Sequence, residues 1–311
     1  MQAKAIVFKN PMHLELESLD LRAPGAGEIE VDIEFSGIST GTERLLWDGT
    51  MPAFPGMGYP LVPGYESVGR IARAGENTTL KVGSRVFVPG ATCFEGVRNL
   101  FGGSASRLVV PQDRTIAVHE DLGANAVLLA LAATAQHALA MQTPPDLIIG
   151  HGVVGRLLAR LTVAAGHAAP VVWEVNSRRQ SGGERYAVVN PKDDARKDYR
   201  AIYDVSGDCA ILDKAIARQA PGSEVVLAGF YKDSLSFAFA PAFMRETRIR
   251  IAAQWKREDL DAVTALVHSG KLSLDGLVTH TQAAHTAQAA YQTAFGDADC
   301  LKMILDWKHS A

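Results

Sequence analysis

The chain has 311 residues, of which 47% are hydrophobic and 21% charged, and these are ordinary values for a soluble globular protein of about two domains. The formal net charge of −3 gives no electrostatic case for binding nucleic acid or an anionic membrane. The three widely spaced cysteines fit a reducing compartment and supply neither a disulfide framework nor a four-cysteine zinc lobe.

The first part of the chain, residues 1–118, is rich in short segments that alternate apolar and polar residues. Examples are "KAIVF", "EIEVDIEFSGI" and "SVGRIARAG", and they are separated by Gly, Pro and Asn. This pattern predicts an antiparallel β domain. Because "MQAKAIVFKN" enters a strand directly, without an apolar export segment, we expect a cytoplasmic protein.

Helices and strands alternate from about residue 119. The apolar stretch 124–141 is interrupted by polar residues, so it predicts a buried helix rather than a membrane span. The strands "DLIIG", "APVVWEV", "AIYDVSG" and "SEVVLAGF" follow, with helical segments between them, and predict a parallel sheet with crossover connections. We expect this second domain to span 119–255 and the last stretch, 256–311, to return to the first domain.

A glycine-rich turn follows the strand "DLIIG". In "GHGVVG", Gly150, Gly152 and Gly155 enclose His151, Val153 and Val154, and the turn opens the helix "VVGRLLARL". Such glycines permit a tight turn, a close approach to a pyrophosphate and close packing of helix on strand. This context predicts a dinucleotide site in a Rossmann doubly wound sheet, and the alternative is a helix–strand turn with no ligand.

Glu174 lies 19 residues after Gly155, at the end of the strand "VVWEV". A carboxylate there accepts hydrogen bonds from the adenosine ribose hydroxyls and repels a 2′-phosphate. Glu174 therefore favours NAD. Arg178 and Arg179 favour NADP instead, since guanidinium groups bind a phosphate well. We expect NAD as the cofactor.

The whole chain resembles the medium-chain dehydrogenase/reductase superfamily. The segments that carry the likeness are "SGISTGTE", "PLVPGYESVGRIARAGENTTLKVGSRVFV", "LAATAQHAL" and "SGKLSLDGLVTHTQAAHTAQAAYQTAFGDADCLKMILDW". The resemblance implies an α/β protein with an N-terminal GroES-like antiparallel β domain and a Rossmann domain.

Several positions depart from the zinc-dependent members of that superfamily. Those members carry cysteine where this chain has Ser39, histidine where it has Tyr65, and another cysteine near Ala130. Only Glu66 is retained, and "PGATCFEGVRNLFGGSASR" replaces the four-cysteine lobe. Catalytic zinc needs three good protein ligands, so we expect no metal site.

A narrower likeness lies in the strings "SGISTGTERLLWDGTMPAFPGMGYPLVPGYE", "VPGATCFEGVRNLFGG" and "GHGVVGRLLARL". They resemble the dehydrogenase family of bacteriochlorophyll biosynthesis. The resemblance implies an NAD-dependent alcohol dehydrogenase, acting on a CH–OH group, with a chlorophyllide-type tetrapyrrole as substrate. The reaction would convert the 3-(1-hydroxyethyl) group of bacteriochlorophyllide a or chlorophyllide a to a 3-acetyl group.

Three residues are candidates for the catalytic work. Tyr65 is the first choice for a hydrogen-bonding or proton-relay group, with Glu66 as a polariser, and His137 competes as a base because histidine titrates near neutrality. Two of them have a structural alternative: Glu66 bonded to backbone or to an arginine, and His137 as a hydrogen-bonded core residue.

Further residues are expected around the ligands. For the cofactor these are Thr42, Thr134, Ser206, Gly229 and Lys302, where Lys302 matches a basic position near the pyrophosphate in relatives or is an exposed strand lysine. An adaptable apolar surface for a flat macrocycle is expected from Trp47, Met51, Phe54, Met57, Tyr59 and Phe94. The alternative for this second group is packing of a loop on the β domain.

Two rival functions remain open. One is a zinc-free quinone or enoyl reductase of the same superfamily that uses NADPH, against which Glu174 argues. The other is a chlorophyllide carrier without catalytic activity. A homodimer is expected from family likeness alone.

Overall fold

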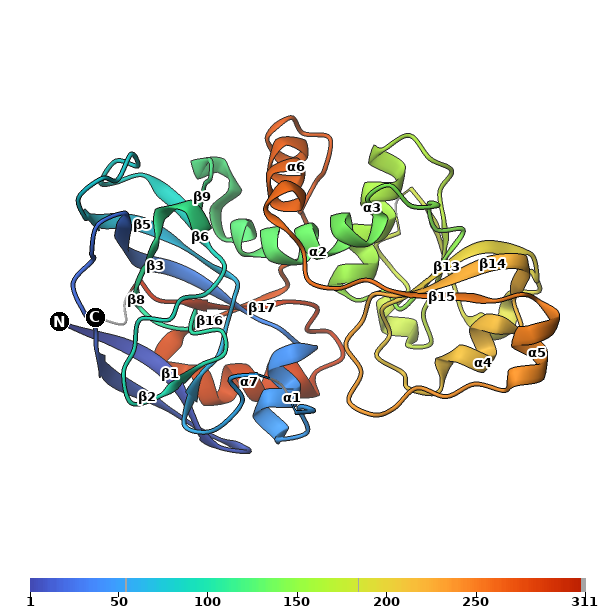
Figure 1. Ribbon diagram of the computed structural model, residues 1–311, viewed down its shortest axis with the longest axis horizontal. Helices are drawn as coiled ribbons and strands as arrows, with labels where there is room; N and C mark the ends of the chain where they lie inside the picture. Colours follow the sequence, from blue (N-terminus) through green and yellow to red (C-terminus); the bar gives the residue numbers. More distant parts are fainter. Residues whose placement is uncertain (54, 184, 309–311) are drawn as a thin grey trace. The chain divides into compact units, whose positions relative to one another are not determined.

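The structure is a computed structural model and describes residues 1–53, 55–183 and 185–308. It contains two compact units: unit 1 consists of Met1–Ala130 and Leu277–Ala311, and unit 2 consists of Leu131–Gly276 (Figure 1). The chain thus divides at 130 and 276, later than the expected 118 and 255. The described part of the last stretch is shared, because unit 2 keeps the helix α6 (Arg257–His268) and unit 1 begins again at Leu277.

Unit 1 is built from mainly antiparallel β-structure to which both ends of the chain contribute. Among the described residues, one sheet has the order β2-β1-β4-β7 and another the order β16-β17-β3-β5-β6-β9, with β8 paired to β3. The strands are β1 (Gln2–Asn10), β2 (His13–Asp20), β3 (Glu28–Ile38), β4 (Leu61–Val62), β5 (Ser67–Ala74), β6 (Arg85–Val88), β7 (Arg98–Asn99), β8 (Arg107–Pro111), β9 (Ile116–Ala117), β16 (His280–Ala283) and β17 (Met303–Asp306).

Short helices join these strands. They are α1 (Thr42–Asp48), the 3-10 helices η1 (Gln112–Arg114), η2 (Glu120–Leu128) and η5 (Ala284–Thr286), and α7 (Ala287–Gly296). Helix α1 ends at Gly49, whose φ of 75° lies in the left-handed region that favours glycine. The ring of Trp47 from α1 packs against Phe8 of β1 and Tyr291 of α7, so residues far apart in sequence share one apolar core.

Unit 2 is a parallel sheet with the order β12-β11-β10-β13-β14-β15, and each pair of neighbours is parallel. Its strands are β10 (Leu147–Ile149), β11 (Val171–Trp173), β12 (Ala187–Val189), β13 (Tyr199–Asp204), β14 (Gln219–Leu227) and β15 (Arg248–Ile251), and its α-helices are α2 (Leu129–Leu139, which starts in unit 1), α3 (Val153–Ala164), α4 (Ile211–Ile216), α5 (Phe239–Met244) and α6. Renumbered along the chain, the order is 3-2-1-4-5-6, that of dinucleotide-binding folds. The predicted fold class is therefore confirmed.

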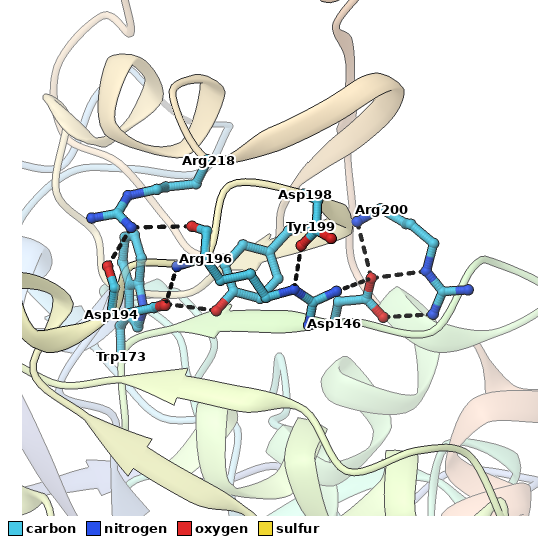
Figure 2. A network of polar contacts seen from close by, with 8 residues as sticks. All are labelled: Asp146, Trp173, Asp194, Arg196, Asp198, Tyr199, Arg200 and Arg218. Atoms are coloured by element: carbon cyan, nitrogen blue, oxygen red, sulfur yellow. Dashed lines mark hydrogen bonds and ion pairs between the residues drawn. The ribbon is translucent and has the colours of Figure 1, made fainter.

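In the described residues of the connections on either side of β12, the helical structure is limited to the short 3-10 turns η3 (Ser177–Arg179) and η4 (Pro191–Asp193). Figure 2 shows the polar network that holds the second of them. The carboxylate of Asp194 accepts hydrogen bonds from the Trp173 indole and the Tyr199 phenol, both at 2.6 Å. Arg200 forms a bidentate pair with Asp146, at 2.7 and 2.9 Å. These contacts tie the loop to the strands in the absence of a crossover helix.

The run Glu120–Leu139 is long and apolar enough to cross a membrane by the criteria of length and composition. Its apolar residues are largely buried within the fold, including Val127, Leu128 and Leu129 at 0% exposure. Core helices of folded proteins pass the same length test, and this burial agrees with the predicted buried helix at 124–141.

Candidate active site

The glycine turn has the geometry that its sequence predicts. Gly150 has a φ of 103°, which favours glycine, and a Cβ on Gly155 would lie 1.9 Å from the carbonyl oxygen of Gly150. A Cβ on Gly152 would meet nothing within 4 Å. Gly150 thus makes the turn, Gly155 lets α3 pack on the strand, and the backbone at Gly152 is open to a ligand.

Three strand ends converge beside this turn. A Cβ on Gly150 would lie 3.1 Å from Cα of Ser206, which follows β13, and one on Gly229, which follows β14, would lie 3.4 Å from Cα of Val205. The chain leaves β10 and β13 in opposite directions across the sheet, and ligands of such sheets bind outside the carboxyl ends at this point. The structure therefore brings Ser206 and Gly229 to the same edge as the turn.

Glu174 follows β11 and points back to the turn. Its carboxylate accepts hydrogen bonds from the backbone N–H of His151, at 3.2 Å, and of Asn176, at 2.8 Å. The Asn176 side chain in turn accepts a hydrogen bond from the backbone N–H of Arg178. Glu174 lies where a ribose next to the pyrophosphate would be held, so the residues present fit a dinucleotide.

The His151 side chain is buried and has a structural environment. Nδ1 lies 2.6 Å from the carbonyl oxygen of Arg179, so Nδ1 carries the proton. Nε2 lies 2.9 Å from the Tyr186 hydroxyl and accepts a hydrogen bond from it. Burial lowers the pKa of His151 to about 4, so the ring is neutral at pH 7. The ring links the turn to the segment before β12, and the predicted contact of this side chain with a cofactor stays a prediction.

His137, on α2, is paired with α6. Its Nδ1 lies 2.8 Å from Oδ2 of Asp259, and the same oxygen accepts a hydrogen bond from the backbone N–H of Lys256 at the start of α6. This arrangement favours the structural alternative of a hydrogen-bonded histidine that joins two helices of unit 2. Thr134 is one helical turn before His137 and is partly buried.

Tyr65 lies in unit 1 in the turn before β5, next to the end of β3. Its hydroxyl donates a hydrogen bond of 2.7 Å to Oγ of Ser39, and its ring packs edge-on against Phe101. Burial and the neighbouring Glu66 carboxylate raise the pKa of the phenol. Tyr65 is thus a hydrogen-bonding group at pH 7 rather than a base. Thr42, at the start of α1, is partly buried.

Glu66 and Lys302 form a buried ion pair. The two side chains are 0% and 1% exposed, and Nζ of Lys302 lies 2.7 and 3.1 Å from the Glu66 carboxylate oxygens and 3.0 Å from the carbonyl oxygen of Ile38. These three oxygens match the three N–H donors of an ammonium group. The pyrophosphate contact expected for Lys302 stays a prediction, and the geometry favours a role inside unit 1.

Glu43 is a second buried carboxyl in unit 1, and the sequence pattern assigned it no role. It accepts hydrogen bonds from the Tyr291 hydroxyl, at 2.7 Å, and from the backbone N–H of Ser39, at 3.2 Å. Burial raises the pKa of Glu43 to about 8, so the carboxyl is mostly protonated at neutral pH. No local pattern joins Glu43 to Tyr291, 248 residues later, and only an acidic residue inside an apolar helix hints at a buried role.

The residues at this place do not fit a catalytic zinc ion. Two of the positions carry the hydroxyl groups of Ser39 and Tyr65, and the Glu66 carboxylate is engaged by an ammonium group. Across the described ranges, no group of three or more His, Cys, Asp or Glu side chains has the arrangement of a metal site.

The predicted pocket residues are distributed between the core of unit 1 and its surface. Trp47 and Phe94 are 6% and 5% exposed and belong to the core. Met51, Met57 and Tyr59 are partly buried and pack against that core, so each keeps some exposed surface. Phe54 lies outside the described residues. The structure thus supports loop packing for Trp47 and Phe94 and leaves the other three available to a ligand.

Comparisons with known proteins agree with this architecture. Residues 25–120 match the model of the alcohol dehydrogenase GroES-like domain. The fold matches that of a short-chain alcohol dehydrogenase from Escherichia coli in complex with NADH, with a TM-score of 0.83, 21% identity and coverage of 98% and 99% of the two chains. It also matches a dehydrogenase of the zinc-binding type from Sinorhizobium meliloti bound to NADP, with a TM-score of 0.82, 17% identity and the same coverage. The match to the GroES-like domain model places the chain in the medium-chain dehydrogenase/reductase superfamily.

Two relatives extend the likeness to the full length of the sequence. A 2-desacetyl-2-hydroxyethyl bacteriochlorophyllide A dehydrogenase from Rhodobacter capsulatus is 54% identical over 99% of both chains. The protein of the same name from Cereibacter sphaeroides is 52% identical over 100% of both. The chain therefore belongs to the 2-desacetyl-2-hydroxyethyl bacteriochlorophyllide A dehydrogenase family, as its long motifs predicted.

Proposed function

We propose that this protein is an NAD-dependent alcohol dehydrogenase that oxidises the hydroxyethyl group of a chlorophyllide-type tetrapyrrole to an acetyl group. The substrate is bacteriochlorophyllide a or chlorophyllide a with a 3-(1-hydroxyethyl) group, the substituent that the relatives' names number as position 2. The observation that carries the proposal is the identity of 54% over the full length to a dehydrogenase named for this substrate.

The nucleotide end of the reaction rests on unit 2. When bound, NAD⁺ accepts a hydride from the carbinol carbon. The open backbone at Gly152 and the free N–H groups of the α3 N-terminus bind the pyrophosphate. The Glu174 carboxylate accepts hydrogen bonds from the ribose hydroxyls and disfavours a 2′-phosphate, which supports NAD over NADP despite the neighbouring Arg178.

Hydroxyl groups of unit 1 bind the alcohol oxygen and transfer its proton. The Tyr65 hydroxyl holds the substrate oxygen by a hydrogen bond and passes protons along its contact with Ser39. The C–H bond of the carbinol carbon breaks, and its hydrogen leaves with both electrons as hydride. The O–H proton leaves to solvent. The products are a ketone, NADH and H⁺. Positive character at the carbinol carbon is delocalised into the conjugated ring, so hydride departure is easier than from a simple alkyl alcohol and no metal is required.

The first experiment combines the purified protein, NAD⁺ and 3-(1-hydroxyethyl)bacteriochlorophyllide a, with and without a chelator. We expect a red shift of the long-wavelength pigment band, NADH formation at the same rate, and no effect of chelation. NADP⁺ in place of NAD⁺ should give a much lower kcat/KM. Tight pigment binding without a spectral shift would instead support a carrier, and NADPH-driven reduction of a quinone would support a reductase.

A homodimer in the cytoplasm is the expected state of the protein. Strand β15 ends the order of the unit 2 sheet, and Ile249 and Ile251 on it are 37% and 74% exposed. Strand β15 alternates arginine with isoleucine, and an edge strand that carries exposed isoleucines pairs readily with the same edge of a second copy. The three cysteines, odd in number and far apart in the sequence, fit a reducing compartment.

A further inference from the structure

The buried ion pair of unit 1 connects three neighbouring strands. Strand β3 lies between β17 and β5, with Ile38 opposite Met303 on one side and Ser36 opposite Ser67 on the other. Lys302 immediately precedes β17, and its side chain passes β3 to reach Glu66, which immediately precedes β5. The pair therefore crosses the middle strand and joins the two outer ones.

Gly37 provides the space for this crossing. A Cβ on Gly37 would lie 2.3 Å from Oε2 of Glu66, a distance that real Cβ atoms do not reach. The backbone N–H of Gly37 also donates to the carbonyl oxygen of Glu66, at 2.8 Å. The absence of a side chain at this one position of β3 is what admits the carboxylate.

The ion pair lies next in sequence to Ser39 and Tyr65, the two residues whose hydroxyl groups are proposed to serve the alcohol oxidation. Lys302 binds the carbonyl oxygen of Ile38, which directly precedes Ser39, and Glu66 directly follows Tyr65. Ser39 and Tyr65 meet in a hydrogen bond of 2.7 Å. A link at Ile38 and Glu66 thus fixes the backbone on both sides of that contact.

We propose that Lys302 and Glu66 are positioning residues that link the Ser39 and Tyr65 segments. This inference rests on the proposed oxidation of an alcohol at Tyr65. Neither residue touches the substrate: the ammonium and the carboxylate bind each other, and both are fully buried. Their task is to hold the Tyr65 hydroxyl in the position from which it binds the alcohol oxygen, because displacement of about 1 Å costs about 100-fold in rate.

The test is a double-mutant cycle with Lys302→Met, Glu66→Gln and the double variant. Each single variant leaves a buried group without its partner, whereas the double variant removes both charges and therefore keeps the fold. NADH binding and near-UV circular dichroism check that each protein is folded. We expect kcat to fall about 100-fold in all three variants, because each removes the same link. NADH affinity should change less than about threefold, since the pair does not touch the cofactor.

Arg85→Met is the matched control. Arg85 is 3% exposed on its side chain and pairs with Glu34 at 2.9 Å in the same unit, away from Tyr65. We expect a lower melting temperature with an unchanged kcat. A double variant with wild-type kcat would overturn the proposal, as would additive losses from the two single variants. A loss of NADH affinity in Lys302→Met alone would show instead that Lys302 contacts the pyrophosphate of the cofactor. A wild-type protein without turnover would overturn the proposed function, and this inference with it.

Discussion

At the scale of single residues, Glu43 links the stability of the protein to pH. Its pKa is about 8 in the folded protein and near 4.5 in the unfolded chain, mainly because it is buried. Below pH 4.5 both states hold the proton. Between pH 4.5 and 8 only the folded state does, so the stabilisation is lost as the pH rises and is gone above 8.

Replacement of Glu43 by Gln should remove this dependence. The amide keeps an acceptor for Tyr291 and does not ionise. We expect the free energy of unfolding of the wild type to fall relative to Glu43→Gln by about 1.4 kcal/mol per pH unit in this window. Urea unfolding of both proteins at pH 5, 6.5 and 8 measures the difference. Parallel curves would show that Glu43 is ionised at neutral pH.

His151 should lower the stability of the folded protein at acid pH. Burial lowers its pKa to about 4 in the folded protein, against 6.5 in the unfolded chain. The unfolded state therefore binds an additional proton between pH 6.5 and 4, and stability is lost as the pH falls through this range. We expect the His151 ring resonances to remain those of a neutral imidazole at pH 5.5 in an NMR titration. A midpoint near 6.5 would contradict the buried contact with Arg179 and Tyr186.

Residues whose roles depend on local sequence were predictable, whereas roles that depend on distant partners were not. The glycines of the turn and Glu174 lie within one strand–helix–strand unit, where fixed spacing determines geometry. The ion pair of Lys302 with Glu66 could not be predicted, because the two residues are 236 positions apart and no periodicity joins them. The pairing of His137 with Asp259 escaped prediction for the same reason.

At the scale of elements, the turn between β10 and α3 separates two roles of glycine. A methyl group on Gly155 would collide with the backbone of Gly150, whereas one on Gly152 has free space in the protein alone. We expect Gly155→Ala to lower the free energy of unfolding by about 1–3 kcal/mol through overpacking. Gly152→Ala should leave stability unchanged and weaken NADH binding at least tenfold, because its methyl group occupies the approach of the pyrophosphate.

Calorimetric binding of NADH and thermal unfolding of both variants test this pair. If Gly152→Ala bound NADH as well as the wild type, the pyrophosphate would not approach this part of the backbone.

The alternation of strands and helices predicted the parallel sheet well, since period and order follow from local pattern. The short connections around β12 could not be anticipated, because their stability depends on contacts such as that of Asp194 with Trp173 and Tyr199 (Figure 2).

At the scale of the whole molecule, the exposed edge of β15 predicts the oligomeric state. Two copies that pair along this edge bury Ile251 and satisfy the free backbone groups of the strand. We expect the wild type to sediment as a dimer and Ile251→Lys as a monomer with kcat within about twofold of the wild type. Lys4→Met, far from β15 in sequence and on a strand of unit 1, serves as the charge-change control. A monomeric wild type would contradict the prediction.

The return of the chain to unit 1 also constrains the order in which the protein forms during synthesis. A ribosome releases residues from the N-terminus onward, and unit 2 is complete once Gly276 has emerged. Unit 1 at that moment lacks β17, so Phe35–Ile38 of β3 have no strand partner on that side, and the Glu66 carboxyl has no counter-ion until Lys302 leaves the exit tunnel. At that stage unit 2 is finished and unit 1 is not. The contacts around Tyr65 are completed only after Lys302 has been added.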